Sequence, residues 1–299
     1  MKELLHENRN RGTLLFPFQH YKMINPTGNL FISYHWHREI EIIYLIEGSL
    51  TVTVSGEQYK LHPGDIYFVN SQELHQFSSM DETTCYYAYV FPMESLNFAI
   101  ADYSQTLYIQ PILRRELLFP RSILQSASCY RNVVREVKEL IEMNEASSKG
   151  YQLGTKASLY KIISYLIEGN HFVKALSKNS SYPFVKAENL KLILTYLQEH
   201  YNEPLKLADI ADTFHMSSKY FCKYFKQNFS KTFVEYLNHY RIEKASVLLL
   251  TTGMSVMDIG FQVGFDNFSY FIKKFREITG VTPAKYRANV SISNPIQPI

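Results

Sequence analysis

The sequence has few cysteines and no long apolar run, and both shortages limit what the protein can be. The three cysteines, Cys85, Cys129 and Cys222, lack the spacing of a disulfide framework or a metal-binding motif. No stretch approaches the roughly 18 apolar residues that a membrane-spanning helix needs. The N-terminal MKELLHENRNRG contains no apolar segment, so we expect no signal peptide and no membrane partner. A reducing cytoplasm is the expected compartment.

Positive charge is unevenly distributed along the 299 residues, a length that suggests two domains at about 100–200 residues each. From residue 184 onward there are 14 Lys and Arg residues against 10 Asp and Glu residues. Residues 1–183 carry 17 Lys and Arg residues and 18 Asp and Glu residues, so the positive net charge of +3 comes from the C-terminal part. This asymmetry suits a polyanionic partner.

The hydrophobic period changes along the chain. Between about Leu30 and Phe91, short β-branched and aromatic segments alternate with polar residues and turn signals, which predicts a small barrel or sandwich. Residues 130–144 and 153–172 have helical apolar stripes. The polar segment 177–183 is the predicted linker, and residues 184–287 are predicted to be helical.

A pattern of two short helices occurs twice in this last part. In the first copy, residues 205–229, the turn lies at His215-Met216 and Ser217 is the predicted cap of the second helix. In the second copy, residues 256–280, Gly264 supplies the turn, Asp266 is the predicted cap and Gly280 ends the helix. In both copies aromatic residues face inward and basic residues face outward. A generic helical hairpin with solvated lysines explains one such copy, but two copies with the same arrangement favour a pair of helix-turn-helix modules. Residues 232–250 form a long amphipathic helix that could hold them apart.

The stretch from about Leu190 to Arg287 resembles the AraC/XylS family of bacterial transcription regulators. The most specific part is DIGFQVGFDNFSYFIKKFREITGVTPAKYR, and the resemblance covers about a third of the chain. It implies double-stranded DNA as a partner, with RNA polymerase as a further candidate. The base-contacting positions that it implies are Lys219, Cys222, Lys223, Phe268, Ser269 and Lys273. Lys226, Lys274 and Arg276 are the expected phosphate contacts, which position the protein without specifying sequence.

The two modules depart from the family pattern to different degrees. His215 stands where the family usually has glycine, and Lys206 stands where a Ser or Thr cap is common. Cys222 is a weak hydrogen-bonding group, so the first module is expected to contact fewer bases. Phe268 is apolar at a position that is often polar, so it either touches a thymine methyl or packs.

A polar constellation in the N-terminal part resembles the cupin motifs. His35-x-His37 is followed by Glu41, then by Pro63-Gly64-Asp65 and His75. Strand alternation places residues 35, 37 and 41 on one inward face of a barrel. In metal-bearing cupins these positions are the ligands, and three imidazoles with a carboxylate suit a divalent transition metal. A polar effector pocket without a metal, commonly for a sugar in such regulators, is the alternative, and a structural remnant is the third. No cofactor is required on either alternative. The further candidates for the pocket wall are Tyr34, Tyr44 and Tyr67.

We therefore expect a multi-domain α+β protein. Residues 1–100 form a cupin-like, effector-sensing barrel, residues 101–183 a helical linker and dimerisation segment, and residues 184–290 a DNA-binding domain with two helix-turn-helix motifs. The expected function is that of a homodimeric, ligand-responsive, sequence-specific DNA-binding regulator of genes for carbohydrate or other small-metabolite use. A metal-dependent cupin enzyme with a helical appendage is the alternative, which leaves the tandem modules unexplained.

Overall fold

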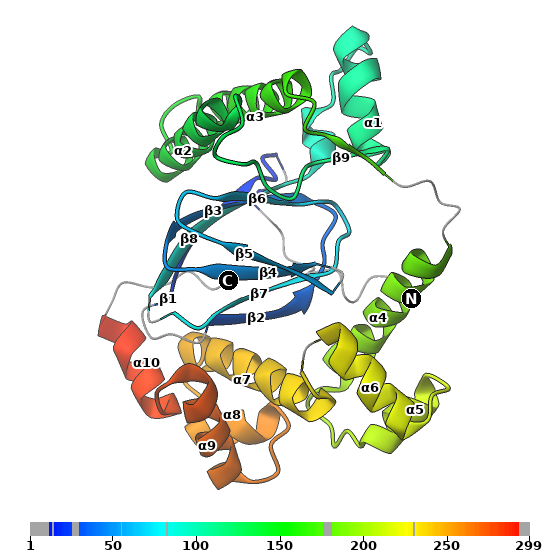
Figure 1. Ribbon diagram of the computed structural model, residues 1–299. Coiled ribbons are helices and arrows are strands. Elements are labelled where there is room, and N and C mark those ends of the chain that lie inside the picture. Colours follow the sequence, from blue (N-terminus) through cyan, green and yellow to red (C-terminus); the bar gives the residue numbers. More distant parts are fainter. Residues whose placement is uncertain are drawn as a thin grey trace.

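The computed structural model describes residues 12–13, 15–25, 30–54, 56–81, 83–175, 181–229 and 231–292. It has an N-terminal β-rich domain, two helices packed on one side of it, and a C-terminal helical domain on another side (Figure 1). This arrangement confirms the predicted fold class. Among the described helices, none is both long and apolar enough to cross a membrane.

Two antiparallel four-stranded sheets form the β-rich domain. The first has the order β1-β8-β3-β6 and the second has the order β2-β7-β4-β5. Their strands are β1 (Gln19–Asn25), β2 (Leu30–His35), β3 (Ile40–Glu47), β4 (Leu50–Val54), β5 (Glu57–Leu61), β6 (Ile66–Val69), β7 (His75–Ser79) and β8 (Thr84–Phe91). The barrel thus begins with β1, which lies before the predicted start at Leu30. This strand is only half-buried, and its sequence QHYKMIN lacks the clear apolar alternation of the other strands. It was not predicted for that reason.

Apolar side chains fill the space between the two sheets. This core includes Ile43, Leu45, Val52, Phe77 and Tyr86, all nearly inaccessible to solvent. The residues between them in sequence point to the outside of the barrel, as expected for a strand period of two. The interior is therefore mostly apolar, although it also holds the buried Tyr67 hydroxyl.

Helices α2 (Tyr130–Ala146) and α3 (Tyr151–Glu168) confirm the two helices predicted in the middle segment, although α3 ends at Glu168 and not at residue 172. They pack on each other and cover the first sheet through a shared apolar core (Figure 1). Between barrel and α2 the chain forms short elements: η1 (Met93–Leu96), a π-helical turn η2 (Gln105–Ile109), α1 (Gln110–Leu113) and β9 (Leu117–Leu118), which pairs with β10 (Val173–Lys174).

The C-terminal domain is entirely helical within the described residues. Its helices are α4 (Ser181–His200), α5 (Leu207–Thr213), α6 (Ser218–Phe229), α7 (Phe233–Thr251), α8 (Val256–Gln262), α9 (Phe268–Thr279) and α10 (Pro283–Ile292). Of the predicted linker 177–183, residues 177–180 lie outside the described residues and residues 181–183 begin α4. Helix α7 contributes to two separate cores, one with α4, α5 and α6, the other with α8 and α9.

Candidate functional site

The first helix-turn-helix module consists of α5, a tight turn and α6. His215 has φ of +54°, so it occupies the left-handed position that the family usually gives to glycine. The Met216 N–H donates to the Ala211 carbonyl at 2.8 Å and the His215 N–H donates to the Asp212 carbonyl at 3.0 Å, as in a Schellman motif. The Ser217 hydroxyl then accepts from the Tyr220 N–H, which confirms the predicted cap.

The second module repeats this turn with different residues. The Phe265 N–H donates to the Gly260 carbonyl and the Gly264 N–H donates to the Phe261 carbonyl, both at 3.0 Å. Gly264 has φ of +92°, and Gly280 ends α9 in the left-handed region as predicted. The predicted cap Asp266 is wrong: the Asn267 side chain accepts from the Tyr270 N–H at 2.9 Å. Asn and Asp cap helices about equally well, so the sequence Asp266-Asn267 contains two possible caps. In the structure, α9 begins after the second of them.

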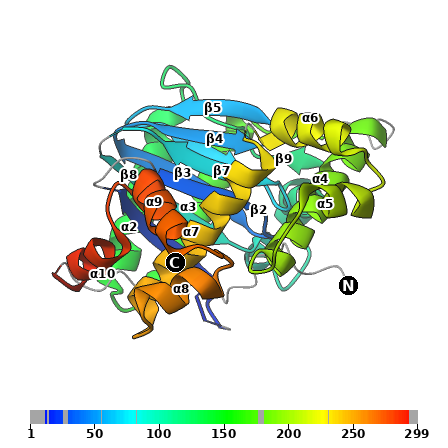
Figure 2. The same cartoon turned by 90° about the horizontal axis from the view of Figure 1, so that it is seen from below.

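The two modules lie at opposite ends of α7 (Figures 1 and 2). A capping box formed by Thr232 and Glu235 fixes the start of α7. Its 19 residues correspond to a length of about 28 Å. This length is comparable to the about 34 Å between successive major-groove sites on one face of DNA. The long helix predicted between the modules is therefore present.

The predicted DNA contacts lie on the recognition helices α6 and α9. All are solvent-exposed except Lys274, which is partly covered: Lys219, Cys222, Lys223, Lys226, Phe268, Ser269, Lys273 and Arg276. Lys274 donates to Glu277 at 2.7 Å, and its ammonium lies 5.6 Å from the ring centre of Tyr270. The hydrogen bond with Glu277 raises the pKa of Lys274, so this lysine is charged but has a competing carboxylate partner.

Two exposed tyrosines on these helices were not predicted as DNA contacts. Tyr220 and Tyr270 are 55% and 42% exposed, respectively. The Asn238 side-chain amide donates to the Tyr270 hydroxyl at 3.2 Å. This hydrogen bond restrains the Tyr270 ring, which follows the predicted base contact Ser269. With 23 tyrosines in the chain, only their position one residue after Lys219 and Ser269 distinguishes them in the sequence.

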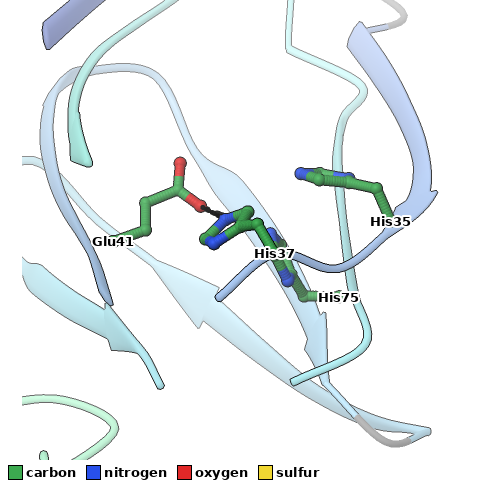
Figure 3. A group of neighbouring side chains, drawn as sticks. All are labelled: His35, His37, Glu41 and His75. Atoms are coloured by element: carbon green, nitrogen blue, oxygen red, sulfur yellow. Dashed lines mark hydrogen bonds and ion pairs between the residues drawn. The ribbon is translucent and has the colours of Figure 1, made fainter. Parts of the chain in front are cut away.

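In the barrel, His35, His37, Glu41 and His75 come together at one end (Figure 3). His35 ends β2, Glu41 lies in β3 and His75 begins β7, where it pairs with His35. Their potential ligand atoms all lie within 4.8 Å of one another. His37, Glu41 and His75 are at most 5% exposed, whereas His35 is half-buried and is the accessible member. The predicted cluster is therefore assembled by the fold.

The hydrogen bonds around the cluster fix the proton positions on its imidazoles. Nδ1 of His35, His37 and His75 faces the backbone carbonyls of residues 33, 39 and 73 at 2.9, 3.1 and 2.8 Å. A carbonyl only accepts, so each Nδ1 carries a proton, which leaves Nε2 as the ring nitrogen for a metal ion or a further proton. Backbone carbonyls on the second nitrogen are the usual supports of metal-ligating histidines.

A buried carboxylate faces two imidazoles inside this cluster. Nε2 of His37 and of His75 each lie 3.3 Å from Glu41 Oε2. Burial alone would raise the pKa of Glu41, but the hydrogen bonds with His37 and His75 outweigh burial and hold the pKa well below its ordinary value. An ionised carboxylate facing two lone pairs is repulsive unless protons or a metal ion lie between them. Three imidazoles and one carboxylate fit a divalent transition metal, for which about 3.3 Å separates the ligands of a tetrahedral site.

The predicted tyrosines of the effector pocket lie in three different places. Tyr67 is fully buried in the core between the sheets. Tyr44 points to the outside of β3, into the core under α2, where the Lys138 ammonium lies 5.9 Å from its ring centre. Tyr34 packs against the DNA-binding domain, and its hydroxyl donates to the Asn228 carbonyl at 3.2 Å. Strand alternation puts Glu41, Ile43 and Leu45 inside and Tyr44 outside, so the sequence pattern itself could have excluded Tyr44.

The chain matches two family models, an AraC-like ligand-binding domain over residues 24–163 and a helix-turn-helix domain over residues 210–289. The HTH-type transcriptional regulator YdeC of Bacillus subtilis (strain 168) is 28% identical over 284 residues, which cover 95% of this chain and 96% of YdeC. YdiP of Escherichia coli (strain K12), another HTH-type transcriptional regulator, is 26% identical over 265 residues, 85% of this chain and 80% of that protein. The solved C-terminal domain of the two-component response regulator yesN from Fusobacterium nucleatum is 38% identical with a TM-score of 0.33, covering 33% of this chain and 98% of that one. The chain belongs to the AraC family of transcription regulators, with an N-terminal ligand-binding domain and a C-terminal helix-turn-helix domain.

Proposed function

We propose that the protein binds a specific bipartite DNA sequence through α6 and α9 and that an effector bound at the His35–His37–Glu41–His75 cluster controls this binding. The observation that carries the proposal is the pair of matching Schellman turns, each followed by a capped helix with an exposed basic face, at the two ends of α7. Because the turns match, each module presents the equivalent face of its second helix. A helix in that position enters the major groove in helix-turn-helix proteins.

The DNA contacts are tested with Lys273→Ala. Lys273 is exposed at the outer face of α9, where its ammonium lies 3.9 Å from Glu277 Oε1. Loss of a base contact costs about 1–3 kcal/mol and relaxes preference at one base pair. The assay is fluorescence anisotropy with a DNA site selected from a random pool by the wild-type protein. Lys149→Ala is the matched control, because Lys149 is exposed between α2 and α3, away from the DNA-binding domain. Equal effects of the two variants would remove Lys273 from the DNA-contacting surface.

A divalent transition metal ion is the effector that we propose first, because three imidazoles and a carboxylate converge in the cluster, with their potential ligand atoms within 4.8 Å of one another. A sugar or another small metabolite is the alternative effector, and genes for carbohydrate or small-metabolite use are then the expected targets. Thermal shift separates the two, since a ligand that binds the native state raises the melting temperature by mass action. Divalent metals and a panel of sugars are offered singly to wild type and to His37→Ala.

A metal-dependent enzyme remains the second candidate function, and the same four residues would serve it. It predicts catalytic turnover by the metal-loaded protein that His37→Ala abolishes. Regulation predicts instead a change in DNA affinity on loading. A homodimer formed through α2 and α3 and contact with RNA polymerase are further parts of the proposal. Light scattering of the purified protein tests the dimer.

A further inference from the structure

One face of the barrel is in direct contact with α4, the first helix-turn-helix module and α7. We call this contact the interdomain surface. On the barrel side it consists of Phe31, Ser33, Tyr34, Trp36 and Leu74. On the other side it consists of Lys191, Gln198, Asn228, Phe229, Lys231, His239 and Glu243. Figures 1 and 2 both show β2 beside α7.

Hydrogen bonds across the interdomain surface converge on two consecutive residues of β2. Glu243 Oε2 accepts from the Ser33 hydroxyl at 2.6 Å and from the Ser33 N–H at 3.3 Å. Tyr34 bonds on both sides: its hydroxyl donates to the Asn228 carbonyl, and its own carbonyl accepts from Gln198 at 3.4 Å. The Glu243 carboxylate is therefore held by the two neutral donors of Ser33.

Apolar and cationic contacts complete the interdomain surface. The Tyr34 ring is 1% exposed and lies edge-on to Phe229 of α6, with ring centres 5.0 Å apart. The Phe31 ring lies 4.5 Å from His239 of α7. Two lysines of the DNA-binding domain lie over barrel rings, Lys231 at 4.7 Å from the centre of Phe31 and Lys191 at 4.8 Å from that of Trp36.

The same short stretches of backbone carry the histidine cluster and the interdomain surface. Tyr34, Trp36 and Leu74 contact the DNA-binding domain, while the residues that follow each of them, His35, His37 and His75, belong to the cluster. The His35 imidazole also donates to the carbonyl of Ser33, the residue that binds Glu243. The β2–β7 pairing shifts register between Ile32 and His35, so the ladder is irregular at this point. A displacement of His35 therefore moves the backbone that binds α7.

We propose, on the basis of the proposed function, that a divalent metal ion at the cluster releases the interdomain surface through β2 and thereby increases DNA affinity. The potential ligand atoms lie within 4.8 Å of one another, whereas those of a tetrahedral site lie about 3.3 Å apart. His37 and His75 already lie 3.3 Å from Glu41, and the His35 and His37 ring centres are 6.0 Å apart, so a bound ion draws His35 inward. The wider cluster belongs to the docked state, in which the barrel and the DNA-binding domain are in contact. The ion therefore binds better to the undocked state, in which the interdomain surface is released. Such a difference in affinity between two states is what a population shift requires. Release also frees Lys191 and Lys231 from the barrel rings, and each added phosphate contact strengthens DNA binding.

Glu243→Gln is the test, because Gln retains the shape of the side chain but removes the charge that Ser33 binds. Metal affinity is measured by titration with Zn²⁺, Mn²⁺, Fe²⁺ and Ni²⁺ singly, and DNA affinity by anisotropy with and without the metal that binds. In wild type we expect metal to tighten DNA binding by about fivefold or more. In Glu243→Gln we expect metal-free DNA binding as tight as that of metal-loaded wild type, together with a metal affinity raised by about the same factor, because coupling between the two sites is reciprocal.

Each other outcome overturns a defined part of the proposal. If wild type binds metal but its DNA affinity does not respond, or if Glu243→Gln responds as wild type does, the coupling through β2 is wrong. If Glu243→Gln without metal binds DNA more weakly than wild type, docking supports DNA binding and the direction is wrong. If no metal binds to wild type, the metal part of the proposed function has failed. Tyr34→Phe, which removes the bond to the Asn228 carbonyl, repeats the test at a second contact should Glu243→Gln not fold.

Discussion

Replacing Gly264 with alanine should destabilise the second helix-turn-helix module far more than its small size suggests. The φ of +92° places any L-residue in the left-handed region, at a cost of about 1–2 kcal/mol. An added Cβ would also lie 2.8 Å from the Tyr201 carbonyl oxygen and 2.9 Å from the Arg241 guanidinium. That guanidinium donates to the carbonyls of Tyr201 and Glu203 at 2.7 and 2.8 Å.

Displacing Arg241 from these partly buried carbonyls loses charge-assisted hydrogen bonds and adds about 1.5–3 kcal/mol. The total expected loss is therefore about 3 kcal/mol or more. Gly150→Ala is the matched control, since Gly150 has φ of +86° and an added Cβ there meets no described atom within 4 Å. It should cost only the backbone part, about 1–2 kcal/mol. Urea unfolding of both full-length variants, followed by circular dichroism, measures the difference. A loss for Gly264→Ala no larger than that for Gly150→Ala would refute this account of the turn.

Two further predictions concern the barrel and the interdomain surface. His37→Ala should abolish stoichiometric metal binding measured by mass spectrometry. His62→Ala is the control and should retain metal, because His62 lies at an exposed turn. Metal retained by His37→Ala would exclude the cluster as the metal site. Burial, with the positive charge of Lys231 adding to it, lowers the pKa of His239 to about 4. The unfolded chain then binds the extra proton between about pH 6.5 and 4, so stability falls as the pH decreases through this window, by about 2 kcal/mol from pH 7 to pH 5. His239→Gln should lose this part of the pH dependence in urea titrations, and an unchanged dependence would contradict the assignment.

The sequence predicts the modules well because their geometry is local. The turn at His215, the cap at Ser217 and the helix end at Gly280 each depend on residues within one turn of chain, and each is confirmed. Where two local solutions were equivalent, as at Asp266 and Asn267, the sequence could not choose between them. The cluster at His35, His37 and Glu41 could be predicted from the sequence for the same reason, because strand alternation assigns these three side chains to one face.

The interdomain surface could not be predicted in this way. Alternation places Tyr34 and Trp36 on the outside of the barrel, but it does not say what covers that outside. The contact between Ser33 and Glu243 joins residues 210 positions apart, and nothing in either segment marks the other. Tyr34 was therefore predicted as a pocket residue, whereas tertiary packing places it against Phe229.

The most direct test of the central claim is selection of binding sites from random double-stranded DNA with the full-length protein. Two modules held at the ends of α7 predict an enriched motif with two conserved blocks about one helical turn, 10–10.5 base pairs, apart. Lys223→Ala should weaken preference in one block and Lys273→Ala in the other. A single block affected by both variants, or no enrichment above that of a general polyanion binder, would contradict the account.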